Sequence, residues 1–219
     1  MSPVAAGSPP GICFVTDRSA TGGRPLLEII RAALAGGADR IQVREKDLQG
    51  RALLELARAV VEAAKTAGGR ARVVVNDRLD VALAARAAGV HLPAEGLPIE
   101  PVRRRAAGRF LIGRSAHSLA EAQRARKDGA DYVILGPIFP TPSKAGLGEP
   151  LGTETLRKAA VTLPIPVWAI GGIGPANAAA LRGIPIAGVA AISAIAGAPD
   201  PAAAVRALRE ALAPGPPAA

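Results

Sequence analysis

Eight short apolar segments rich in β-branched residues recur along the chain, and each is followed by a stretch with the apolar spacing of a helix. The expected strands span residues 12–16, 40–44, 72–75, 89–92, 110–114, 132–135, 167–170 and 188–192. The expected helices span residues 25–35, 50–66, 79–86, 98–106, 119–127, 153–160, 175–181 and 201–212. Strands that alternate with helices run parallel, because each crossover helix returns the chain to the same edge. Eight such units predict the α/β class and, within it, a single (β/α)8 TIM barrel.

The chain of 219 residues is long enough for one such barrel and shows no linker or break in composition. We expect one domain over residues 1–219, with the barrel at about 12–212 and frayed tails at 1–11 and 213–219. The first tail lacks the basic and apolar regions of a signal peptide, and no apolar run approaches the ~18 residues of a membrane span. The single cysteine, Cys13, excludes an internal disulfide. These features favour a cytoplasmic protein.

The formal net charge of +9 makes nucleic acid the first partner to consider. Aromatic residues make up only 2% of the chain, however, so no stacking platform for single strands is expected. The arginines are also dispersed, and 103–105 is the only run of three. We therefore predict small anionic, phosphate-bearing substrates, with neither nucleic acid nor membrane as partners. A homo-oligomer is compatible with the sequence, and arginine-rich solvated helix faces would produce the same net charge.

Polar side chains follow nearly every expected strand, at the end where barrel enzymes place their active sites. The second strand leads into Gln-Val-Arg-Glu-Lys at 42–46, the third into Asn76 and Asp77, and the fourth contains His91. The fifth is followed by Ser115 and His117, and the sixth by a long loop, 136–152, rich in glycine and proline. Loops of this length in compact domains are typical of lids over a site.

The expected seventh and eighth strands end in Gly171-Gly172 and in a turn at Ser193, where barrels commonly bind phosphate through backbone N–H groups. Arg44, Lys46 and Lys144 would add cationic donors, although each also suits a solvated surface.

Asn76 and Asp77 provide the hard oxygen ligands of a phosphate-bound Mg²⁺, or alternatively an Asx turn or helix cap. His91 and His117, the two histidines of the chain, are candidate acid/base groups or structural residues.

Taken in order, these segments resemble the thiamine-phosphate synthase / thiazole tautomerase family over about residues 12–208. The resemblance is carried by Gln42–Lys46, Val75–Asp80, Gly89–Leu92, Gly113–Ser118, Gly129–Tyr132, Gly136–Lys144, Val167–Ile173 and Ile192–Ile195. Each segment is modest by itself, and the whole set in this order is specific to the family.

The resemblance implies a synthase that joins an aminopyrimidine methyl diphosphate to a thiazole phosphate, releases diphosphate and uses Mg²⁺. It assigns Gln42, Arg44, Glu45, Lys46 and Asn76 to the pyrimidine diphosphate, Asp77 to Mg²⁺, Ser115 and Lys144 to the diphosphate side, Thr141 and Ser143 to the thiazole, and Gly172, Ile192 and Ser193 to the thiazole phosphate. The side chains expected to be catalytic are Arg44, Lys46, Ser115, His117 and Lys144.

One position departs from the synthase pattern. After the histidine of the fourth strand, synthases usually read Gly-Gln-x-Asp, in which the Asp is a second metal ligand, whereas this chain has Gly96 there. Glu95 is one residue away and would supply a carboxylate if the loop shifted.

The tautomerase branch remains an alternative, because the His-Leu-Pro segment at 91–93 and the segment 113–118 are similar to it. A tautomerase shifts a proton within a thiazole carboxylate phosphate without a metal, and its histidine matches His117. Retention of Gln42, Lys46, Asp77 and Lys144, which a tautomerase does not need, favours the synthase. A phosphate-binding barrel enzyme of another specificity and a non-catalytic regulator that binds thiazole or thiamine phosphate are the remaining alternatives.

Overall fold

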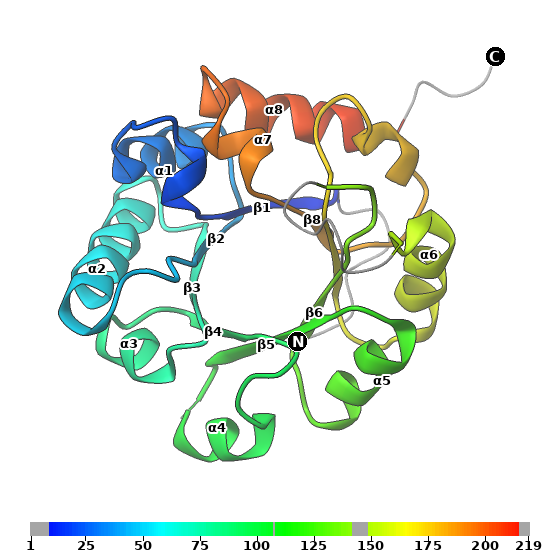
Figure 1. The fold of residues 1–219 in the computed structure, drawn as a ribbon, viewed down its shortest axis with the longest axis horizontal. Helices are drawn as coiled ribbons and strands as arrows, with labels where there is room; N and C mark the ends of the chain where they lie inside the picture. Colours follow the sequence, from blue (N-terminus) through cyan, green and yellow to red (C-terminus); the bar gives the residue numbers. More distant parts are fainter. Residues whose placement is uncertain (1–8, 107, 142–148, 215–219) are drawn as a thin grey trace.

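A computed structural model describes residues 9–106, 108–141 and 149–214, and its eight strands close into one parallel barrel (Figure 1). Neighbouring strands pair in chain order, and the last strand pairs with the first to complete the ring. The strands are β1 (Gly11–Val15), β2 (Arg40–Val43), β3 (Arg72–Asn76), β4 (Gly89–Leu92), β5 (Leu111–Ala116), β6 (Tyr132–Leu135), β7 (Val167–Ile170) and β8 (Gly188–Ala191). The predicted (β/α)8 TIM barrel is confirmed.

Helices form a ring outside the strands (Figure 1). They are α1 (Leu26–Ala35), α2 (Gly50–Thr66), α3 (Leu79–Ala84), α4 (Ile99–Arg105), α5 (Leu119–Lys127), α6 (Gly152–Thr162), α7 (Ser193–Ala196) and α8 (Pro201–Leu212), with the short 3-10 helices η1 (Arg18–Ala20) and η3 (Ala178–Leu181). The side chains of Ser118 and Asp200 accept hydrogen bonds from backbone N–H groups in the first turns of α5 and α8. These caps satisfy donors that a helix start otherwise leaves unpaired.

The elements differ from the expected ones in three places. The helix expected at 175–181 is only η3, because the Asn177 side chain holds the preceding residues in a turn through Gly174 N and Gly172 O. Ser193 begins the four-residue helix α7 rather than a turn. The barrel begins inside the expected first tail, since Gly11 already pairs with β8. Residues 1–8 and 215–219 of the two expected tails lie outside the described residues.

Two apolar layers hold the barrel together, because successive residues of a strand point to opposite faces. The larger layer lies between the strands and the helices and includes residues from every strand. The smaller layer fills the barrel interior with Cys13, Val15, Leu111, Tyr132, Ile134, Trp168 and Ala190. Each fully buried large apolar side chain contributes about 1.5–3 kcal/mol, so the outer layer supplies most of the hydrophobic stabilisation.

A Gly-Ala-Asp sequence precedes both β2 and β6 and has the same structural role in each place. The Asp39 carboxylate accepts a hydrogen bond from a backbone N–H of β1, and that of Asp131 accepts one from β5. Asp39 also pairs with Arg209 of α8, and Asp131 with Arg103 of α4, both at 2.7 Å. The repeated sequence therefore ties the strand starts to the helix layer.

The lower part of the barrel interior contains a buried cation between two aromatic rings. The guanidinium carbon of Arg40 lies 4.0 Å from the centre of the Tyr132 ring and 4.5 Å from that of Trp168. A Cβ atom on Gly113 would lie 2.1 Å from Cζ of Tyr132, and one on Gly188 would lie 2.5 Å from Cζ3 of Trp168. Glycine at these two inward positions gives the rings the room to enclose the cation.

Substitution Gly113→Ala is expected to lower the free energy of unfolding by about 1–3 kcal/mol, because overpacking a filled core displaces the surrounding side chains. Urea unfolding followed by circular dichroism measures the change. Gly174→Ala is the matched control, since a Cβ atom there has its nearest neighbour at 3.7 Å, in ordinary contact. Equal stability of the two variants would show that the Tyr132 ring does not need this space.

Candidate active site

Four polar side chains from four neighbouring strands meet in the upper part of the barrel interior. Gln42 of β2 donates from Nε2 to Oδ1 of Asn76 on β3 at 3.2 Å. His91 of β4 is directly paired with Asn76 in the ladder, and its Nε2 lies 2.9 Å from Oγ of Ser115 on β5. The structure therefore brings Gln42, Asn76 and Ser115, all expected from the sequence, into one cluster together with His91.

Gln42 has an acceptor that the described protein groups leave unused. Its side chain is 3% exposed, and its Oε1 atom is buried without a hydrogen-bond partner among the described residues. A buried acceptor without a partner costs about 1–3 kcal/mol. A ligand with an N–H group at this position would satisfy the amide oxygen of Gln42.

His91 is the most strongly perturbed titratable group in the cluster. Burial, together with smaller contributions from the charges of Arg40, Arg114 and Arg44, lowers the pKa of its imidazole to about 3. Its Nδ1 atom lies 3.3 Å from Oη of Tyr132, so both ring nitrogens face hydroxyl groups. His91 is therefore neutral at physiological pH and acts within the fold rather than as a solvent-exposed base.

Two of the expected cations stand at the rim of this cluster. Arg44 and Lys46 follow β2 directly, with Arg44 half-buried and Lys46 exposed. The Arg44 backbone N–H is fixed by Oγ1 of Thr16 at 2.9 Å. Within the described ranges, neither cationic group has a hydrogen bond or ion pair. Both charges are therefore available to an anionic ligand.

Arg114 precedes Ser115 on β5, but its side chain binds other groups of the protein. Its guanidinium donates to the carbonyl oxygens of Pro93 at 2.6 Å and Leu97 at 2.7 Å, and more weakly to those of Ala94 and Gly96. The loop between β4 and α4 is therefore gathered around one side chain. Nothing in the sequence identified this role, because an arginine after a strand is equally typical of a ligand-binding residue.

Glu45, which the family resemblance assigned to substrate binding, follows β2 and contacts the segment after β1. Its carboxylate accepts a hydrogen bond from the backbone N–H of Arg18 at 3.0 Å and forms an ion pair with the Arg18 guanidinium at 3.5 Å. Burial raises the pKa of the Glu45 carboxyl group. These contacts order the segment after β1, so the substrate role of Glu45 stays a prediction.

Asp77 has a positive φ angle, which is unusual for a residue other than glycine. Its φ angle is 63°, in the left-handed region that costs a non-glycine residue about 1–2 kcal/mol. The backbone N–H donates to the His91 carbonyl at 2.8 Å, and the residue is exposed. No group of three or more His, Cys, Asp or Glu side chains in the described ranges forms a metal site. A metal here would need ligands from its substrate.

The expected phosphate loops converge at the ends of β7 and β8. Gly171 and Gly172 have φ angles of 101° and 64°, and a Cβ atom on Gly172 would lie 2.4 Å from the Pro140 carbonyl oxygen. The loop after β6 therefore packs against the glycines, with Phe139 N donating to the Gly171 carbonyl at 3.0 Å. Ser193 begins α7 beside them and is exposed, and Ile192 immediately precedes it.

His117 is exposed and lies outside the buried cluster. Its backbone N–H donates to Glu121 at 2.8 Å, and its Nδ1 atom lies 2.6 Å from the carbonyl oxygen of Gly136. A carbonyl oxygen only accepts, so Nδ1 carries a proton and Nε2 remains for another partner. Of the residues expected in the loop after β6, Thr141 is half-buried, whereas Ser143 and Lys144 lie outside the described residues.

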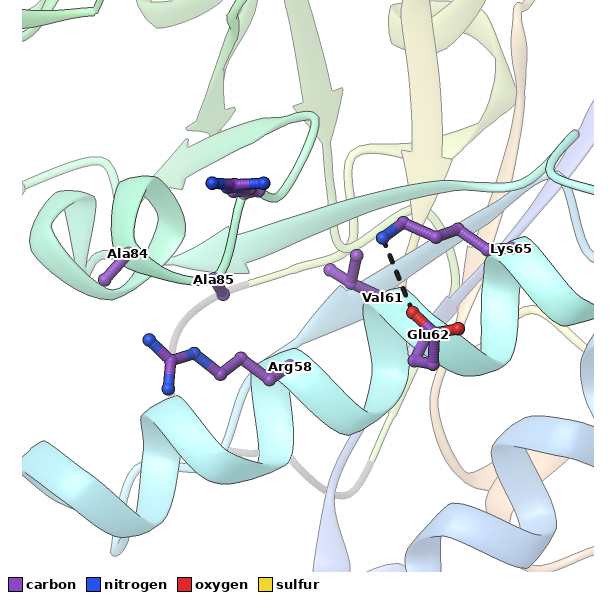
Figure 2. Close-up of a pocket in the computed structure, with 7 residues that line it drawn as sticks. Arg58, Val61, Glu62, Lys65, Ala84 and Ala85 are labelled. Carbon is purple, nitrogen blue, oxygen red and sulfur yellow. Dashed lines mark hydrogen bonds and ion pairs between the residues drawn. The ribbon is translucent and has the colours of Figure 1, made fainter.

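The grooves on the helix layer are separate from this cluster. One of them, between α2 and α3, is lined by Arg58, Val61, Glu62, Lys65, Ala84, Ala85 and Arg86 (Figure 2). Lys65 and Glu62, about one turn apart on α2, pair on one side of it at 3.4 Å, and the lining comes from the second half of α2 and the end of α3, at the end of the barrel opposite the polar cluster. Among the described helices, none combines the length and the apolar character that crossing a membrane requires.

Comparison with known proteins identifies the family. The family described as thiamine monophosphate synthase matches residues 12–195. The chain belongs to this family. It is 49% identical over 189 residues to the thiamine-phosphate synthase of Moorella thermoacetica, covering 86% of this chain and 89% of the relative. It is 45% identical over 208 residues to the thiamine-phosphate synthase of Roseiflexus castenholzii, covering 94% of this chain and 90% of that relative.

A solved structure agrees. The thiamine phosphate pyrophosphorylase from Pyrococcus furiosus superposes with a TM-score of 0.83 at 39% identity, covering 92% of this chain and 95% of that one. The resemblance to the thiamine-phosphate synthase family predicted from the sequence is confirmed.

The buried neutral His91 predicts that this synthase-family barrel loses stability in mild acid. The folded pKa of about 3 lies below the usual value of 6.5, so the unfolded chain binds the extra proton between these pH values. Stability is therefore full above pH 6.5 and falls as the pH drops, by up to about 1.4 kcal/mol per pH unit for this one proton. Urea unfolding at pH 7, 6 and 5 without Mg²⁺ measures the slope.

In the same experiment, His91→Gln is expected to flatten the dependence on pH. His117→Asn, which removes the exposed histidine, should leave the dependence as in the parent chain. An unchanged slope in His91→Gln would mean that other groups cause the loss.

Proposed function

We propose that the chain is a thiamine-phosphate synthase of thiamine biosynthesis, a transferase that joins an aminopyrimidine methyl diphosphate to a thiazole phosphate. The observation that carries the proposal is a buried acceptor below two cations. Among the residues that the structure describes, Oε1 of Gln42 has no hydrogen-bond partner, and Arg44 and Lys46 at the rim of the cluster have neither a side-chain hydrogen bond nor an ion pair. An aminopyrimidine offers the N–H donor that the amide oxygen lacks. Its diphosphate offers the negative charge that the two cations lack.

The reaction breaks the bond between the pyrimidine methylene carbon and the diphosphate oxygen, and the electron pair leaves with the diphosphate. The thiazole nitrogen then supplies the electron pair of the new carbon–nitrogen bond. Arg44 and Lys46 would stabilise the charge that develops on the leaving group, as would Lys144 by resemblance. Gln42 and Asn76 would hold the pyrimidine ring so that its methylene carbon faces the thiazole.

Mg²⁺ fits the donor set on the rim. The exposed Asp77 carboxylate has no hydrogen bond or ion pair in the part of the chain that the structure describes, and Mg²⁺ typically combines one or two carboxylates with substrate phosphates. When bound, the ion neutralises charge on the departing diphosphate. Asp77 would hold it, since its carboxylate is exposed and follows β3 directly.

The thiazole side is assigned to the loops after β6, β7 and β8. Backbone N–H groups at Gly172, Ile192 and Ser193 would bind its phosphate, because the glycines permit close approach of the backbone. Thr141 and Ser143 would contact the ring, and Ser115 would bind the diphosphate from the opposite side.

Thiazole tautomerase is the second candidate, and one observation favours it. The Gly136 carbonyl fixes the proton of His117 on Nδ1, which leaves Nε2 as an exposed acceptor for a proton taken from a ligand. Relatives at 45–49% identity are thiamine-phosphate synthases, which places the synthase first.

The purified protein is expected to form thiamine phosphate from the pyrimidine diphosphate and the aromatic thiazole carboxylate phosphate, with release of diphosphate and CO2, only when Mg²⁺ is present. Product is measured by chromatography after oxidation to a fluorescent thiochrome derivative. In a synthase His117 is not needed as a general acid/base, so His117→Asn should retain activity within about tenfold. In a tautomerase the same substitution would remove the acid/base, a loss that typically costs 10²–10⁴-fold in rate. A folded protein without product, together with tautomerase activity that His117→Asn abolishes, would establish the second candidate.

Asp77→Asn is expected to reduce kcat/KM for the diphosphate substrate by about 100-fold and to raise the Mg²⁺ concentration needed for half-maximal rate, because the ion loses its anionic ligand. Glu95→Gln is the matched control, as it neutralises an exposed carboxylate on the neighbouring strand's loop. A Mg²⁺ requirement that rises in Glu95→Gln as well would assign Glu95 as the second ligand.

A further inference from the structure

Polar groups run through the centre of the barrel from its lower part to the proposed substrate. The Arg40 guanidinium lies over the Tyr132 ring, Oη of Tyr132 lies 3.3 Å from Nδ1 of His91, and Nε2 of His91 lies 2.9 Å from Oγ of Ser115. Tyr132 and His91 are 0% and 1% exposed, whereas Ser115 is partly open. The chain of contacts thus begins in the core and ends at the proposed site.

The Tyr132 hydroxyl sets the direction of the first hydrogen bond. Burial raises the pKa of this phenol to about 12, so it keeps its proton. Nδ1 of His91 lies within hydrogen-bond distance of Oη, and the other side chain that interacts with this hydroxyl, the Arg40 guanidinium, carries donors alone. A proton on Nδ1 would leave the buried hydroxyl proton of Tyr132 without an acceptor, at a cost of about 1–3 kcal/mol. Tyr132 therefore donates and Nδ1 accepts.

The second hydrogen bond follows from the first. A neutral imidazole with an accepting Nδ1 carries its proton on Nε2. The Nε2–H group then donates to Oγ of Ser115, which lies 2.9 Å away. Because Oγ already accepts from His91, its own proton is free to point elsewhere. No other hydrogen bond of the Ser115 side chain is present in the described ranges, and the residue is partly exposed near the end of β5, where a ligand could accept this proton.

We propose that Tyr132 and His91 are positioning residues that hold the Ser115 hydroxyl as a hydrogen-bond donor toward the bound diphosphate ester. Tyr132 selects the Nε2–H tautomer of His91. His91 then donates to Oγ of Ser115, so that the hydroxyl acts as a donor to the ligand and not as an acceptor. Arg40 lies at the buried end of this series of contacts. Its positive charge polarises each donor toward the bound anion, since successive hydrogen bonds in one direction strengthen one another. The role of Ser115 rests on the proposed synthase function, whereas the tautomer of His91 does not.

The tautomer can be observed directly because the chain has only two histidines. In His117→Asn protein labelled with ¹⁵N-histidine, every imidazole signal belongs to His91. A two-bond ¹H–¹⁵N correlation at pH 7 is expected to show a protonated Nε2 and an unprotonated Nδ1. Adding Tyr132→Phe should introduce the Nδ1–H form. A parent spectrum with Nδ1–H, or one that Tyr132→Phe leaves unchanged, would overturn the proposal whether or not the protein is a synthase.

Trp168→Phe is the matched control for packing. Trp168 covers the other face of Arg40, 4.5 Å from its guanidinium carbon, but has no hydrogen bond to the chain of donors among the described residues. This variant should lower the melting temperature and leave the His91 tautomer unchanged. A tautomer that shifts in Trp168→Phe to the same extent as in Tyr132→Phe would indicate a general loosening of the core and would overturn the role of Tyr132.

Kinetics test the effect on Ser115. Tyr132→Phe is expected to lower kcat/KM for the diphosphate substrate by about tenfold, and Ser115→Ala by more, because a charge-assisted hydrogen bond is weakened in one and lost in the other. The double variant should match Ser115→Ala, since Tyr132 acts through the missing hydroxyl. Effects that multiply in the double variant would overturn the coupling. If no variant and no parent protein turns over, the synthase proposal fails while the tautomer result stands.

Discussion

The closed parallel barrel has one narrow interior, and every second residue of every strand competes for it. In this chain the buried guanidinium of Arg40 determines which side chains fill the interior. Arg40 needs the faces of Tyr132 and Trp168 to replace water, and those two rings fill the space that side chains at 113 and 188 would take. The glycines on neighbouring strands are therefore a consequence of the buried charge.

The same interior positions become polar toward the strand ends. In the register, Gly113 lies between His91 and Tyr132 on the neighbouring strands, and Asn76 lies opposite His91 on the other side. Hydroxyl, imidazole and amide groups from four strands thus sit above the aromatic layer, where water is excluded from below. Their hydrogen bonds are fixed by a rigid sheet, which is the condition for a site that does not reorganise during reaction.

Much of the fold and part of the site could be predicted from the sequence, because each depends on a local pattern. Eight alternations of strand and helix define the barrel. Gln42, Asn76 and Ser115 share one end of its interior because they lie near the carboxyl ends of β2, β3 and β5. The partners of His91 could not be predicted, since Tyr132 is 41 residues away and faces it only in one register. The turn that replaces the helix expected at 175–181 depends on the Asn177 side chain, which helix propensity does not capture.

Arg114 explains physically how the chain accommodates a glycine at 96. A carboxylate at this position would stand within the loop whose carbonyl oxygens the Arg114 guanidinium gathers, and the two groups would attract one another. With glycine there, the backbone of Gly96 turns tightly enough for its N–H to bond the Pro93 carbonyl at 2.9 Å, and Arg114 takes only neutral partners in the loop. The loop is then shaped by hydrogen bonds from one arginine to carbonyl oxygens.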